Sequence, residues 1–399
     1  MTNHHQFSRG AMVLVIVGSL CAIGGCPGAQ RRTTRFDGAR RQTTGTGTQT
    51  ATQAGTQADD AAELQAAEPT GATLLVRTED RLIEFLVERE AVTLRATAAF
   101  PTVDGEVIAG PVVVMVPGAG DVSRRGLRQG DGVSTYPSSV AVTVAWQEAF
   151  AVSGALSLAY DKRTCGPNDD DDCLKNSQAD LDDSGPVAMA TDVDAACALA
   201  RTLPGFDGRL VLMAHGQGTQ VALASSCARE ADAIVLLSPI PRTIDGVLVD
   251  ALISRQTQKL VDAKHATTPE HKASLQDEAA ALRNLAATRQ ERFASMRAGK
   301  FAADARVDGA TIGFWLGWMD VTGRTRTMMT PLKDKILLVL ANGDLQLGDG
   351  DKALVQGLPA RKIMVVDADH HLLNEGALSP TVSLRVVDAV VEVLLPPAT

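Results

Sequence analysis

A turn in the middle of the chain has the shape of a reactive site but lacks a reactive side chain. The stretch RLVLMAHGQGTQVAL, residues 209–223, is an apolar run that stops at Ala-His-Gly-Gln-Gly and continues in small, helix-compatible residues. A strand that turns sharply into a helix can present a nucleophile, yet the residue at the centre of this turn is Gly216. Glycine has no oxygen or sulfur with which to attack a carbonyl. The nearby hydroxyls, on Thr219, Ser225 and Ser226, lie further along the helix.

The segments that must position this turn alternate between predicted strands and helices. The aliphatic runs are continuous rather than alternating with polar residues, which favours a parallel sheet covered on both faces and an α/β fold. Strands are predicted at residues 91–100, 111–120, 154–163, 208–216, 232–240, 334–344 and 361–371. Residues from about 243 to 325 are rich in helix formers, and they predict a helical cap over the carboxyl edge of the sheet.

Five short motifs follow these elements in a set order. They are VPGAGD (116–121), YDKRTCG (160–166), AHGQGT (214–219), ANGDLQL (341–347) and DADHHLLN (367–374). Together they resemble the oxyanion loop, the turn after the next strand, the nucleophile elbow, the acid turn and the histidine turn of α/β-hydrolases. The resemblance is greatest to the exported bacterial branch of serine aminopeptidases and esterases, and it covers roughly residues 90–395. It implies an α/β-hydrolase fold with a mostly parallel sheet.

The resemblance also implies a role for the histidine and acid turns. His371 would be the general base, because it precedes Leu-Leu as the family histidine precedes Leu-Phe, and His370 is the alternative. Asp344 would be the acid that orients the base. The acid turn is two residues shorter than in relatives, so Asp349 and Asp351 could take its place.

Gly216 occupies the nucleophile position of this resemblance. The oxyanion donors would be the backbone N–H of Gln217 and that of Ala119 or Gly118. The elbow position usually has a positive φ, which costs a non-glycine residue roughly 1–3 kcal/mol and which glycine adopts freely. Glycine therefore keeps the turn while removing the nucleophile, and in a comparable hydrolase that removal lowers turnover on the order of 10⁶-fold.

The sequence thus predicts a pseudo-hydrolase that binds a small-molecule ligand or a protein partner under the cap. One alternative is a hydrolase of esters or amides in which His371 directs water onto the substrate. Another is a hydrolase with its nucleophile elsewhere, such as Ser238, although no Gly-x-Ser-x-Gly occurs anywhere in the chain. We expect no cofactor and no metal. No Cys/His spacing suits zinc, and DLDDSG (180–185) matches only the first half of a calcium loop.

The N-terminal region predicts export. Residues 1–26 read as a signal peptide with a lipobox, because Arg9 precedes an apolar run that ends in IGGC at Cys26. Cys26 would then carry a lipid, and an ordinary signal peptide is the alternative. Residues 27–71 predict a disordered linker rich in Thr, Gln, Gly and Ala, and 72–399 the folded domain. We expect a bacterial protein facing the periplasm or the cell exterior, attached to the membrane by its lipid alone. The net charge of −9, without a basic stripe, argues against nucleic acid as a partner.

Four cysteines remain in the predicted domain: Cys165, Cys173, Cys197 and Cys227. An even number in an exported domain suggests two disulfides. Their connectivity stays open, and buried free thiols are the alternative.

Overall fold

A single mixed sheet forms the centre of the molecule. The computed structural model describes residues 74–87, 90–119, 122–126, 141–163, 185–302, 305–344, 346–372 and 382–394. The strand order is β1-β2-β5-β4-β6-β7-β10-β11, with the short β3 paired to β2. The strands are β1 (Leu74–Val87), β2 (Glu90–Val103), β3 (Glu106–Val107), β4 (Gly110–Val116), β5 (Leu156–Tyr160), β6 (Phe206–His215), β7 (Ala233–Leu237), β10 (Ile336–Ala341) and β11 (Lys362–Val366).

Strands β5, β4, β6, β7, β10 and β11 pair in parallel, so their carboxyl ends meet at one edge of the sheet. Strands β1 and β2 pair antiparallel and continue the sheet beyond β5. In open α/β sheets, ligands bind at the carboxyl edge of the parallel strands. This edge is therefore where the chain should carry its site.

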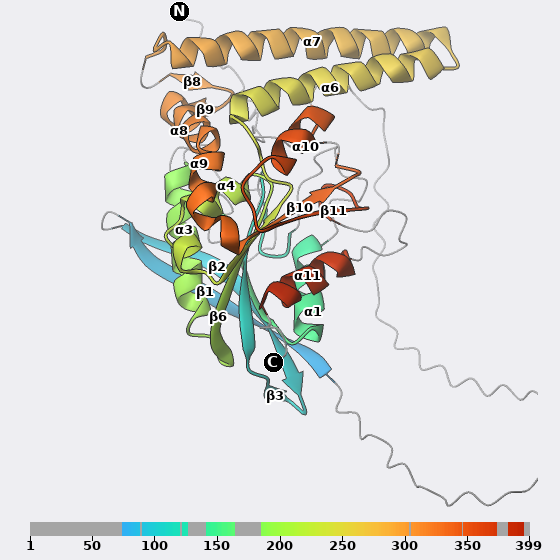
Figure 1. The fold of residues 1–399 in the computed structure, drawn as a ribbon. Coiled ribbons are helices and arrows are strands. Elements are labelled where there is room, and N and C mark those ends of the chain that lie inside the picture. Colours follow the sequence, from blue (N-terminus) through green and yellow to red (C-terminus); the bar gives the residue numbers. More distant parts are fainter. Residues whose placement is uncertain are drawn as a thin grey trace, which may run out of the picture. The chain divides into compact units, whose positions relative to one another are not determined.

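Helices cover both faces of the sheet (Figure 1). On β4, Val113 and Met115 belong to one apolar cluster and Val112 and Val114 to the other, as the alternation of side chains along a strand requires. The first cluster includes α1 (Val142–Val152) and α11 (Leu384–Leu394), and the second includes α3 (Pro186–Ala200) and α4 (Gly218–Ala224). Every residue of β4 is buried, which explains why its sequence is a continuous aliphatic run. The predicted α/β class, with a mostly parallel sheet covered on both faces, is confirmed.

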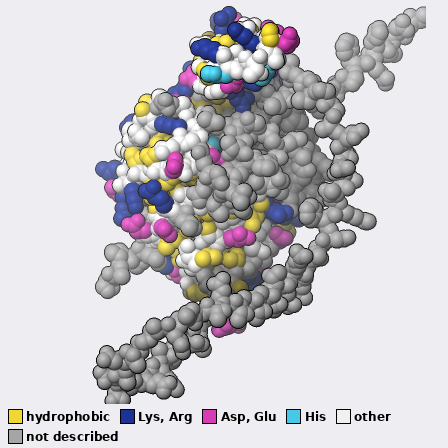
Figure 2. All heavy atoms as spheres, turned by 90° about the vertical axis from the view of Figure 1, so that its right-hand side faces the viewer, with side chains coloured by type: hydrophobic (Ala, Val, Ile, Leu, Met, Phe, Trp, Pro, Cys, Tyr) yellow, Lys and Arg dark blue, Asp and Glu magenta, His cyan; other side chains and the backbone are white. Residues whose placement is uncertain are grey.

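The segment predicted as a helical cap contains a long helical hairpin. Its two arms are α6 (Ile244–His265) and α7 (Pro269–Arg297), and Thr268 caps α7 by accepting a hydrogen bond from the His271 N–H. The smaller elements are α5 (Cys227–Glu230), β8 (Arg306–Val307), β9 (Ala310–Thr311), α8 (Ile312–Gly323), α9 (Thr325–Met329), the 3-10 helix η3 (Thr330–Lys335) and α10 (Asp349–Gln356). The hairpin lies on the side of the carboxyl edge (Figure 1). Side chains of both charges are mixed over its visible end (Figure 2).

No helix within the described ranges is both long enough and apolar enough to cross a membrane. The predicted boundaries after residues 26 and 71, together with Cys26, lie outside the described residues.

Candidate functional site at the carboxyl edge

The turn after β6 has the geometry of a nucleophile elbow. Strand β6 ends at His215, Gly216 has a φ of +51°, and α4 begins at Gly218. The N–H of Gly216 donates to the Leu237 carbonyl at 2.8 Å, which fixes the turn to the end of β7. A side chain at Gly218 would collide with the carbonyl oxygen of Pro117. The second glycine of the motif therefore allows the loop after β4 to lie against the elbow.

His370 lies opposite Gly216 and is paired with Asp344. The Nδ1 atom of His370 is 2.8 Å from Oδ2 of Asp344, and both residues are buried. Because an ionised carboxylate only accepts hydrogen bonds, Nδ1 is the donor in this pair. A Cβ atom built on Gly216 would lie 3.7 Å from Nε2 of His370 and 3.9 Å from its Cε1. Nε2 thus faces the place where a nucleophile would be attached.

The pKa of Asp344 is lowered well below its ordinary value. Burial by itself would raise it, but the charge of His370 and the hydrogen bond from its ring outweigh burial. The Ser238 hydroxyl and the N–H of Gln346 lower this pKa further. Asp344 therefore stays ionised and orients the His370 ring, which is the part that an acid plays beside a general base.

The sequence predicted His371 as the base paired with Asp344. That prediction is wrong, because the structure places the alternative, His370, beside Asp344 and opposite Gly216. The backbone N–H of His371 donates to Asp369 at 2.9 Å, and its side chain lines a cavity of ≈ 70 Å³ beside α1. The ring of His215 also lines this cavity, and its Nε2 is 2.8 Å from the carbonyl oxygen of His370. Met115, Trp146 and Met213 are among the apolar walls of the cavity.

Asp344, Asp349 and Asp351 were each predicted as a possible acid, and the geometry supports Asp344. Asp351 lies on α10 and pairs instead with the guanidinium of Arg242, whose Nε is 2.6 Å from its Oδ1. Asp349 begins α10, and its side chain is outside the described part of the structure. Of the two whose side chains the structure describes, Asp344 is the one that is hydrogen-bonded to His370.

Ser238 acts on the acid of the pair, because its hydroxyl lowers the pKa of Asp344. It follows β7 with a φ of +46° and is 1% exposed. Sequence reasoning considered Ser238 only as a nucleophile and missed its place beside Asp344. The small polar residue at the end of a strand next to β6 was the available signal.

Asp161 and Lys162, directly after β5, bind the predicted oxyanion loop and the residues that follow it. Lys162, directly after β5, donates from Nζ to the Gly118 carbonyl at 3.1 Å. Asp161 accepts from the Arg124 backbone N–H at 2.5 Å and from its guanidinium at 2.9 Å. Ala119 follows Gly118 in this loop, and Gln217 is the residue after Gly216 at the start of α4. The structure thus places both predicted donors at the carboxyl edge, on the loop and on the elbow.

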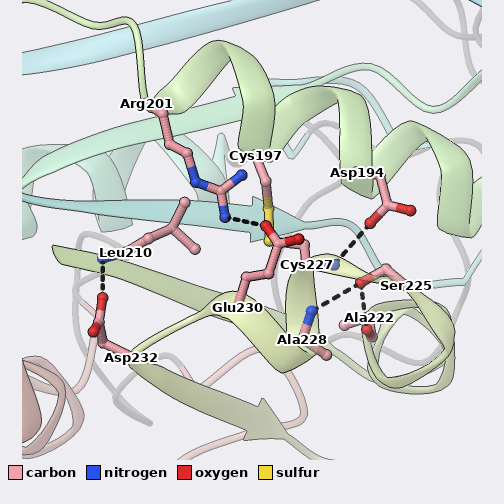
Figure 3. The surroundings of a disulfide bond; sticks show 10 residues. All are labelled: Asp194, Cys197, Arg201, Leu210, Ala222, Ser225, Cys227, Ala228, Glu230 and Asp232. Atoms are coloured by element: carbon pink, nitrogen blue, oxygen red, sulfur yellow. Dashed lines mark hydrogen bonds and ion pairs between the residues drawn. A yellow bond between two sulfur atoms is a disulfide. The ribbon is translucent and has the colours of Figure 1, made fainter. Parts of the chain in front are cut away.

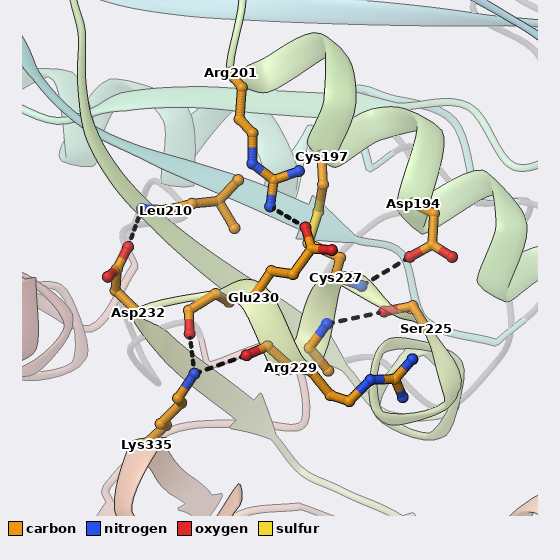
Figure 4. A network of polar contacts seen from close by, with 12 residues as sticks. Asp194, Cys197, Arg201, Leu210, Ser225, Cys227, Arg229, Glu230, Asp232 and Lys335 are labelled. Carbon is orange, nitrogen blue, oxygen red and sulfur yellow. Dashed lines mark hydrogen bonds and ion pairs between the residues drawn. A yellow bond between two sulfur atoms is a disulfide. The ribbon is translucent and has the colours of Figure 1, made fainter.

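A disulfide and several polar contacts anchor the chain beyond the elbow (Figures 3 and 4). Cys197 on α3 is bonded to Cys227 on α5. The backbone N–H of Cys227 also donates to Asp194, and Lys335 binds the carbonyl oxygens of Arg229 and Ala231. One of the two predicted disulfides is therefore present. Cys165, Cys173 and most of the DLDDSG segment lie outside the described residues.

The described residues contain no group of three or more His, Cys, Asp or Glu side chains that is arranged to hold a metal ion. The three neighbouring histidines, His215, His370 and His371, instead contact each other through their rings, with centroids 4.5 to 5.5 Å apart.

No protein-family model and no curated protein matches the sequence. Solved structures with a similar fold include DcsB, determined with its substrate analogue, at 17% identity over 79% of this chain and 99% of that chain, with a TM-score of 0.45. The α/β-hydrolase GrgF from Penicillium sp. sh18 matches at 14% identity over 80% and 98%, with a TM-score of 0.44. Est1E from Butyrivibrio proteoclasticus matches at 14% over 78% and 96%, with a TM-score of 0.41. At identities of 14 to 17% and TM-scores of 0.41 to 0.45, these similarities assign neither a family nor a function to the chain.

Proposed function

We propose that the protein is an exported, hydrolase-like lipoprotein that binds a ligand at the carboxyl edge and does not form an acyl-enzyme. The observation that carries this proposal is the place opposite His370. Nε2 is aimed at residue 216 from a distance that suits a serine, yet residue 216 is glycine. The base, its acid and the loop are arranged for acyl transfer, and the atom that would accept the acyl group is missing.

The loss of that atom outweighs the groups that remain. In a serine hydrolase the base takes the hydroxyl proton, the oxygen bonds to the carbonyl carbon, and backbone donors stabilise the oxyanion. Without the hydroxyl, the remaining groups retain only a residual acceleration, roughly 10³-fold over water. Binding is the property of the site that survives the change, because it needs no covalent bond at residue 216.

The absence of a side chain at residue 216 also leaves room for a second function, hydrolysis by a water molecule. Neutral His370 has its lone pair on Nε2, facing a space with room for more than a hydrogen atom at Gly216. A water molecule in that space could lose a proton to Nε2 while its oxygen attacks an ester carbonyl directly. This activity would depend on His370 and not on His371.

Hydrolysis of p-nitrophenyl butyrate distinguishes the two functions. We expect purified residues 27–399 to give no turnover above that of His370→Gln. Turnover that His370→Gln abolishes and His371→Gln retains would overturn the proposed loss of catalysis and establish the water mechanism.

Restoring the hydroxyl tests whether the rest of the site is intact. Gly216→Ser should become labelled by a serine-directed fluorophosphonate, because the new hydroxyl would lie within reach of Nε2. The labelling should disappear when His370→Gln is added and persist when His371→Gln is added. A folded Gly216→Ser protein that resists labelling would contradict an intact site around Gly216.

The proposal of export has support from the cysteines as well as from the N-terminus. The disulfide between Cys197 and Cys227 fits an oxidising compartment, where such bonds form and persist. The sequence IGGC, ending at Cys26, supports a lipid anchor.

A further inference from the structure

Lys162 fixes the orientation of one peptide unit in the loop after β4. Its side chain is buried, and its Nζ donates to the Gly118 carbonyl at 3.1 Å. Lys162 belongs to the segment directly after β5, and β4 lies between β5 and β6 in the sheet. The Gly118 carbonyl therefore points toward the β5 side of the loop.

The N–H of the same peptide unit must point the other way. The described chain contains no cis peptide bond, and in a trans peptide the carbonyl and the following N–H are directed oppositely. The N–H that follows the Gly118 carbonyl belongs to Ala119, so it is directed toward β6, whose end carries Gly216. The close approach of Pro117 to Gly218 brings this part of the loop to the elbow.

A second donor faces the same place from the opposite direction. When His370 is protonated, its Nδ1–H remains on Asp344 and its Nε2–H points at the space above Gly216. The pKa of Asp344 is lowered, so its carboxylate stays negative beside the imidazole ring. The N–H of Ala119 and, when the ring is protonated, the Nε2–H of His370 are thus both directed toward Gly216, which carries no side chain.

We propose that the site binds a monocarboxylate, with one oxygen on Nε2–H of His370 in the place of the missing serine hydroxyl and the other on the N–H of Ala119. Lys162 is the positioning residue that aims the Ala119 N–H. The inference rests on the proposed function, because a carboxylate fits only while residue 216 has no side chain. A neutral amide of the same shape offers a single carbonyl acceptor and no negative charge, so it should bind more weakly.

Butyrate and butyramide are the matched probes, and isothermal titration calorimetry on residues 27–399 is the measurement. We expect butyrate to bind at least about tenfold more tightly, since hydrogen bonds to ionised groups are roughly twice as strong as neutral ones. The preference should disappear in His370→Gln and persist in His371→Gln. Gly216→Ser should also lose butyrate binding, because its hydroxyl would fill the carboxylate oxygen's place. Equal affinity for the two probes in the wild-type protein would overturn the inference.

Lys162 is tested through the ratio of the two affinities. Lys162→Met should lower the preference for butyrate, and Lys162→Arg should restore part of it, since a guanidinium can also donate to the Gly118 carbonyl. Thermal unfolding of both variants separates this effect from a loss of folding. A folded Lys162→Met protein that keeps the full preference would refute the positioning role.

The two proposals fail in different ways. His370-dependent hydrolysis of p-nitrophenyl butyrate would refute the proposed loss of catalysis, whatever butyrate does. A protein without turnover that binds butyrate no better than butyramide would refute the carboxylate inference alone.

Discussion

At the scale of single residues, the backbone at position 216 explains how a nucleophile can be lost without loss of the turn. Gly216 has a φ of +51°, a conformation that costs a serine roughly 1–3 kcal/mol. Its hydrogen bond to Leu237 is made by the backbone and does not depend on the side chain. A serine at this position would bear that strain, whereas glycine adopts the turn freely and keeps its backbone contact.

The lowered pKa of Asp344 predicts a pH dependence of stability. In the unfolded chain this carboxyl has its ordinary pKa near 3.8, so the folded state gains stability above that pH and loses it as the pH falls further. At pH 7 we expect Asp344→Asn to be less stable than wild type by at least about 1.4 kcal/mol, the value of one pKa unit. Urea unfolding at pH 7, 5 and 3 measures the difference, which should shrink at the lowest pH. A difference that is constant across these values would contradict the pairing with His370.

Which of two adjacent histidines serves the site could not be predicted from sequence. Both follow the same strand, and the motif around them is satisfied by either. The choice depends on the turn that follows β11, where Leu372 has a φ of +61° and Asp369 binds the His371 N–H. These local contacts direct His370 to Asp344 and His371 to the cavity beside α1. Sequence spacing contains no measure of such directions.

At the scale of elements, the disulfide between α3 and α5 stabilises the segment that carries the elbow. Cys197 and Cys227 are 30 residues apart, and a ring of this length is worth about 3–4 kcal/mol in the chain-entropy model. We expect the double variant Cys197→Ala/Cys227→Ala to lose about 3 kcal/mol of unfolding free energy in urea. Native wild-type protein should resist dithiothreitol, because both cysteines are at most 1% exposed. A double variant as stable as wild type would contradict this role.

The main elements of the fold were predictable because burial leaves a clear trace in sequence. β4, β7 and β10 are mainly aliphatic runs in which every residue is buried. β1 was not predicted, because its exposed positions include Leu82 and Leu86 and its half-buried ones include charged residues. The pairing of Cys197 with Cys227 was left open, since it depends on how α3 lies beside α5 and not on spacing along the chain.

At the scale of the whole molecule, the proposed lipid anchor predicts where the protein is found. Full-length protein expressed in a bacterium should partition to the membrane fraction and incorporate labelled palmitate. Cys26→Ser should lose both the label and the membrane association, because Cys26 is the residue that would carry the lipid. Cys21→Ser is the matched control and should keep both. Palmitate label that persists in Cys26→Ser would refute the anchor.

The disulfide has a consequence for the order of events before the protein reaches its destination. The ring closed by Cys197 and Cys227 encloses all of β6, the elbow and α4. In the reducing cytoplasm this ring would stay open, and the precursor would be the less stable form of the chain. A precursor that unfolds easily suits a route through a narrow translocation channel. On the export that we propose, covalent closure around the site would therefore mark the moment at which the chain has crossed the membrane.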